Sequence, residues 1–70
     1  MEAYAVTEKT YIEDYSFTVV SMIKATDLCD AYRKVEDGQK KDKNFSEILQ
    51  IKLLTPAEVE SLEKIGVDYY

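Results

Sequence analysis

Two stretches of alternating apolar residues flank Glu13-Asp14, and their mutual register constrains the fold more than any other feature of the chain. Both stretches, 2–12 and 15–25, are rich in the Thr, Tyr, Val and Ile residues that are typical of strands. A tight turn at Glu13-Asp14 would pair Ile12 with Tyr15, Thr10 with Phe17, Val6 with Ser21 and Tyr4 with Ile23. This register places the larger apolar residues on one face, as a hairpin over a core requires. The turn lacks the glycine or asparagine that two-residue hairpins favour, so a longer loop or a bulge is the alternative.

A first helix is predicted after the hairpin. Thr26-Asp27 offers capping oxygens at its start. One apolar stripe with helical spacing follows, made of Leu28, Ala31, Tyr32 and Val35. Gly38 is expected to end the helix, because glycine adopts the left-handed conformation without strain. A polar loop over 39–46 comes next, with Phe45 as its anchor.

A third strand and a second helix complete the predicted elements. The strand spans 47–54, with Leu49, Ile51 and Leu53 facing inward. Thr55 caps the helix, Pro56 occupies its first position and Glu58 closes a capping box. The helix spans 56–65, and Gly66 ends it, with Val67 making the apolar contact that accompanies a glycine cap.

The element order β-β-α-β-α predicts one α+β domain over residues 1–70. We expect a three-stranded, mostly antiparallel sheet with the third strand beside the first and both helices on one face. A chain of 70 residues supports only a thin core, so function is expected on a surface rather than in a deep cavity.

The residues that usually carry catalysis are missing. The chain has no histidine, which is the commonest general base and metal ligand. Cys29, the only cysteine, lies between Asp27 and Asp30, whose charge disfavours a thiolate, so it is expected to be a packing residue. We therefore predict no catalytic, metal or cofactor site, and no enzyme. The lone cysteine and the absence of a secretory signal after Met1 predict a cytoplasmic protein.

The hairpin face that points away from the core is the first candidate binding surface. It carries more apolar side chains than a solvated face normally does. Its predicted contact residues, together with the acidic turn beside them, are Tyr11, Glu13, Asp14, Val20 and Met22. Two explanations compete: the face binds a protein partner, or the carboxy-terminal residues 67–70 cover it.

A basic segment is the second candidate. Residues 33–43 carry five cations in a chain of net charge −5, namely Arg33, Lys34, Lys40, Lys41 and Lys43. Such a segment is able to contact nucleic acid or an acidic partner, although cations near a helix end also stabilise the helix dipole. A homodimer formed through an open sheet edge or the outer face is a further alternative. No membrane contact is expected.

The layout resembles small proteins of bacteriophages and mobile elements. The similarity is carried by the hairpin YAVTEKTYIEDYSFTVVSMIKA, the helix that begins TDLCDAYRKV and the strand EILQIKLL. Some anti-CRISPR inhibitors share this β-β-α-β layout. The resemblance covers residues 3–54, and the helix from Pro56 departs from it. It implies a stoichiometric inhibitor that binds a host or defence protein complex, and it identifies no functional residue.

Overall fold

Two long strands form the centre of the fold. The computed structural model describes residues 1–70, and it places β1 (Glu2–Ile12) antiparallel to β2 (Tyr15–Ala25). The predicted register is confirmed from Ile12↔Tyr15 to Tyr4↔Ile23. The turn has only two residues, and Glu13 adopts a φ of 50°, in the left-handed region that favours glycine. The apolar alternation of the two strands therefore determines the pairing without the turn residues that usually support it.

The third strand, β3 (Phe45–Leu53), pairs antiparallel with β1, which gives the sheet order β2-β1-β3. The predicted neighbour of the first strand is thus confirmed. The pairing shifts by one residue, from Thr7↔Gln50 to Glu8↔Ile48, so Leu49 is a bulged residue. Leu49 is half-exposed, and Ile48 packs against the core in its place. The prediction that Leu49 faces inward was wrong because the bulge interrupts the two-residue period.

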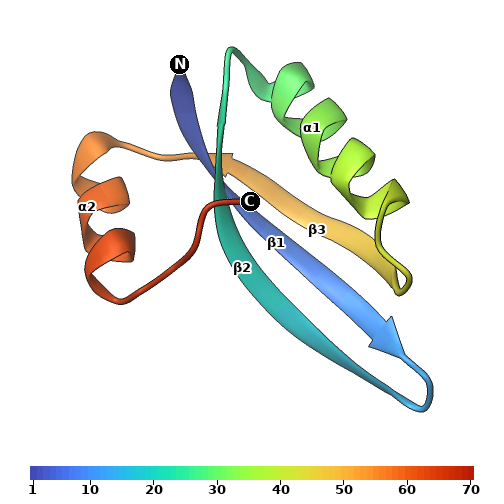
Figure 1. Cartoon of the computed structure of the whole chain (residues 1–70). Coiled ribbons are helices and arrows are strands. Elements are labelled where there is room, and N and C mark those ends of the chain that lie inside the picture. Colours follow the sequence, from blue (N-terminus) through green and yellow to red (C-terminus); the bar gives the residue numbers. More distant parts are fainter.

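The first helix, α1 (Leu28–Lys40), covers one face of the sheet, here called the inner face (Figure 1). The predicted cap at Asp27 is confirmed, since its Oδ1 accepts the Asp30 N–H at 2.8 Å. The helix buries Ala31 and Val35 against core residues of all three strands, namely Tyr4, Val6, Ile23, Ala25 and Ile51. Gly38 was predicted to end the helix, but the helix continues for two more residues.

The second helix, α2 (Pro56–Lys64), begins at the predicted residue and ends one residue before the predicted Ile65. Thr55 and Glu58 form the capping box, and Gly66 adopts a φ of 87° after the last turn. The Val67 N–H then bonds the Leu62 carbonyl at 3.0 Å, which satisfies one of the free carbonyls at the helix end.

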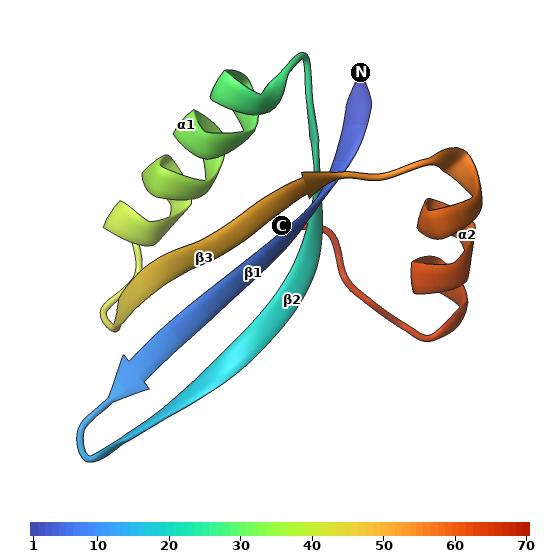
Figure 2. The ribbon, with the colours of Figure 1, turned by 180° about the vertical axis from the view of Figure 1, so that it is seen from behind.

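The position of α2 differs from the prediction. In both ribbon views the strands run between the two helices (Figures 1 and 2). The helix lines a shallow hollow of about 400 Å³ with Ala5, Val20 and Lys52, which alternate with the core residues and belong to the outer face. Its own residues are nowhere fully buried. The expectation that both helices cover one face was therefore wrong for α2, because α1 alone packs on the inner-face core and α2 lies against the outer face.

The last residues return to the sheet and pair with β2. The Met22 N–H bonds the Asp68 carbonyl at 2.9 Å, the Tyr70 N–H bonds the Met22 carbonyl, and Tyr69 forms a parallel bridge with Met22. The Tyr70 side chain lies against α1, where its hydroxyl donates to the Val35 carbonyl at 3.1 Å. Residues 68–70, here called the tail, thus extend the edge of the sheet over a short distance.

Candidate functional site

The structure separates the five residues predicted to bind a partner. Tyr11 lies on the outer face next to the turn that carries Glu13 and Asp14, and all three side chains are exposed. Val20 also lies on the outer face, but it lines the hollow beside α2. Met22 is fully buried where the tail pairs with its backbone. Tyr11, Glu13 and Asp14 therefore form one surface, Val20 belongs to another, and the expectation that Met22 contacts a partner was wrong.

An aromatic residue that the sequence did not assign to this surface completes it. Phe45, at the start of β3, pairs with Tyr11, and their ring centroids are 5.6 Å apart. The Lys9 Nζ lies 5.4 Å from the centre of the Tyr11 ring, and the Tyr11 hydroxyl donates to Glu47 Oε1 at 3.3 Å. These four residues, Lys9, Tyr11, Phe45 and Glu47, are here called the aromatic patch.

Phe45 was missed because the third strand was predicted to begin two residues later. A strand that starts at 45 would have put Phe45 on the same face as Glu47 and in register with Tyr11, so the two-residue period carried the signal once the strand began at 45. In the structure 69% of Phe45 is exposed, the highest value for any aromatic residue of the chain. The strand register therefore holds a large apolar ring in solvent.

The basic segment is partly neutralised. Asp30 forms ion pairs with Arg33 and Lys34, and Lys34 also donates to the Lys24 carbonyl at 3.0 Å. The Thr26 N–H, then the Arg33 guanidinium, hold the pKa of the Asp30 carboxyl well below its usual range. Lys40, Lys41 and Lys43 form no ion pair. The structure thus divides the five predicted cations into two that stabilise the start of α1 and three at its far end.

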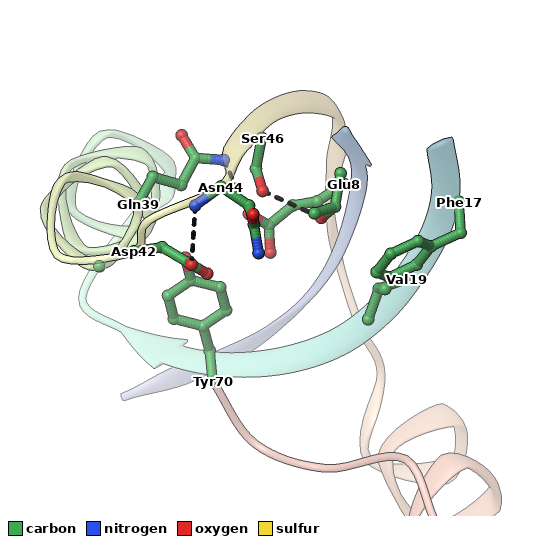
Figure 3. A pocket seen from close by; sticks show the side chains of 10 residues that line it. Glu8, Phe17, Val19, Gln39, Asp42, Asn44, Ser46 and Tyr70 are labelled. Atoms are coloured by element: carbon green, nitrogen blue, oxygen red, sulfur yellow. Dashed lines mark hydrogen bonds between the residues drawn. The ribbon is translucent and has the colours of Figure 1, made fainter. Parts of the chain in front are cut away.

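The inner face carries a polar hollow of about 460 Å³ between the hairpin and the end of α1 (Figure 3). Glu8 lines it and is the only buried charged residue, and its Oε2 accepts from Gln39 Nε2 at 2.7 Å. The Thr10 and Ser46 hydroxyls bond each other at 2.9 Å. Because each hydroxyl is bonded to the other rather than to a carboxylate, neither is activated by a base.

Tyr70 points into the same hollow, opposite Phe17 and Val19 (Figure 3). Burial, followed by the nearby Glu8 carboxylate, raises the pKa of Tyr70 to about 12. A phenol with so high a pKa stays protonated at neutral pH and acts as a hydrogen-bond donor, not as a base. The polar groups of the hollow thus serve to hold the tail, α1 and the hairpin together.

The side chains that could hold a metal ion are dispersed, and the single cysteine lies apart from the hollows. No three acidic or cysteine side chains come together in a way that would hold a metal ion. The expectation that Cys29 is a packing residue was wrong, because its position in the first turn of α1 leaves it exposed. The arrangement that the structure does provide is an exposed aromatic patch beside an acidic turn.

Neither helix is long and apolar enough to cross a bilayer. Comparison of the chain with protein-family models, with curated proteins and with solved structures finds no match.

Proposed function

We propose that this chain is a protein-binding module that contacts its partner through the aromatic patch. The observation that supports the proposal is the exposure of Phe45, whose ring lies against the Tyr11 ring in a tilted arrangement. Aromatic residues are enriched at protein interfaces, where a few of them supply most of the binding energy. Because the two rings already hold each other in place, little side-chain entropy is lost when a partner covers them.

The charges around the patch favour a partner with a basic surface. Glu13 and Asp14 lie in the adjoining turn, and Glu47 lies within the patch itself. The whole chain carries a net charge of −5, which repels nucleic acid and attracts cationic protein surfaces. Lys9 reduces the local negative charge but is engaged with the Tyr11 ring.

The form that we propose for this binding is stoichiometric inhibition of a host or defence protein complex. The pattern-level resemblance to small phage proteins supports it, and the single cysteine supports a cytoplasmic location as part of the same proposal. An inhibitor of this kind would lower the activity of its target in proportion to the amount added, with an end point at equal numbers of molecules.

Affinity capture from a bacterial lysate, followed by calorimetry with the captured protein, tests the patch. Phe45→Ala is expected to weaken binding at least about tenfold, because it removes the most exposed ring of a small interface. Tyr15→Ala is the matched control, since Tyr15 is similarly exposed but lies on the inner face. Equal affinity of the Phe45→Ala variant and the parent chain, or no captured protein at all, would contradict the proposal.

A further inference from the structure

One edge of the sheet is open along most of β2. Met22 uses both its N–H and its carbonyl to bond the tail, so these groups point away from β1. Backbone groups alternate sides along an antiparallel strand, and the corresponding groups of Ser16, Thr18 and Val20 therefore point to the same edge. No backbone group of the chain bonds them there. The tail thus marks one end of an unpaired edge that runs back to the turn.

This edge lacks the features that usually prevent strands from pairing. Natural edge strands are interrupted by charges, proline or bulges, because an open edge recruits other strands. The segment from Tyr15 to Met22 reads YSFTVVSM and contains no charge, no proline and no glycine. Its pairing with β1 is regular over its whole length. The sequence and the geometry together make this edge available to another strand.

Apolar side chains lie beside the open edge. Phe17 and Val19 are neighbours on the inner face, and 42% of Phe17 and 40% of Val19 is exposed. They lie at the wall of the polar hollow, beyond the end of α1. A strand that pairs with β2 would place its own inner-face side chains next to Phe17 and Val19 and cover part of both.

We infer that a second copy of this chain occupies the edge, with the two β2 strands antiparallel about a twofold axis at Thr18. In this register Thr18 faces Thr18 of the second copy, and Ser16 faces Val20. Each of these residues presents both an N–H and a carbonyl, so every pair exchanges both of its hydrogen bonds. The surface is therefore complementary to itself, which is the requirement for a symmetric dimer.

The side chains fit the same symmetry. An axis perpendicular to the sheet keeps the inner faces of both copies on one side, so Phe17 packs against Val19 of the second copy. The register stops before Met22, where the tail already occupies the edge. The result is one continuous sheet of two copies, with the aromatic patch of each copy on the outer face and outside the interface.

Sedimentation equilibrium of the full chain over a range of concentrations tests the dimer. Thr18→Lys is expected to weaken dimerisation at least about tenfold, because it places two cations directly opposite each other across the axis. Thr18→Glu is expected to do the same with two anions. Gln50→Lys is the matched control, since Gln50 is exposed on β3, at the other edge of the sheet, and it should leave the dimer intact.

Mixing the two Thr18 variants is the decisive measurement. A cation facing an anion restores association only if position 18 of one copy meets position 18 of the other, so an equimolar mixture is expected to form heterodimers. A monomer at every concentration would overturn the inference, and a strand of another protein would then be the candidate partner for this edge. A dimer that Thr18→Lys does not weaken, or a mixture that stays monomeric, would also overturn it.

Discussion

At the scale of single residues, Gly38 and Tyr70 have to be explained together. An alanine inside a helix is more favourable than a glycine by about 1 kcal/mol, yet α1 contains Gly38 in its last turn. A Cβ atom at this position would lie 2.6 Å from the Tyr70 Cε1. The glycine therefore provides the space in which the Tyr70 ring reaches the Val35 carbonyl. The sequence pattern suggested a helix end there because it contains no sign of this long-range contact.

Gly38→Ala, made both in the parent chain and in a Tyr70→Ala chain, tests whether Tyr70 depends on the glycine. In a Tyr70→Ala chain it is expected to raise the free energy of unfolding by about 1 kcal/mol, the difference in helix propensity. In the parent chain the gain is expected to disappear or reverse, because the added methyl group displaces the ring. Urea denaturation of the four proteins gives an interaction energy, and a value near zero would mean that Tyr70 does not depend on Gly38.

At the scale of elements, the parts of the fold that follow from local patterns were predictable. The hairpin register followed from the two-residue period, and the start of α2 followed from Thr55, Pro56 and Glu58. The bulge at Leu49 and the pairing of the tail with Met22 were not predictable, because both depend on contacts between distant segments. A single bridge leaves no periodic pattern in the sequence.

The two helix caps are expected to behave differently when they are removed. α2 has no buried residue, so Thr55→Ala should loosen this helix alone, and its amides should exchange with solvent about fivefold faster, as a loss of about 1 kcal/mol implies. Asp27→Ala is the matched change in α1, which buries Ala31 and Val35, and it should lower the global free energy of unfolding by about 1 kcal/mol. Hydrogen exchange and urea denaturation together separate the two effects. An equal global loss for both variants would show that α2 unfolds with the core.

At the scale of the whole molecule, a small core on one face leaves the other surfaces for binding. Only ten residues are buried, and most of them lie between α1 and the inner face. The strand pattern placed Tyr11 and Met22 on the outer face with the acidic turn beside Tyr11, but it did not predict that Met22 is fully buried. It missed Phe45, because the strand boundary was two residues off. A binding surface is harder to predict than a hairpin, since it combines side chains from segments that pair only in the folded chain.

The tail links the stability of the whole molecule to alkaline pH. Folding raises the pKa of Tyr70 from an ordinary value of 10 to about 12, chiefly by burial. A raised pKa means that the folded state favours the protonated phenol, so the stabilisation is complete below pH 10 and is lost as the pH rises toward 12. Urea denaturation across this range should show a steeper loss of stability for the parent chain than for Tyr70→Phe. Tyr15→Phe, which changes an exposed tyrosine, should keep the parent's slope. If the stability of Tyr70→Phe falls as steeply with pH as that of the parent chain, folding does not bury the Tyr70 hydroxyl. The tail would then not close the hollow beside Glu8.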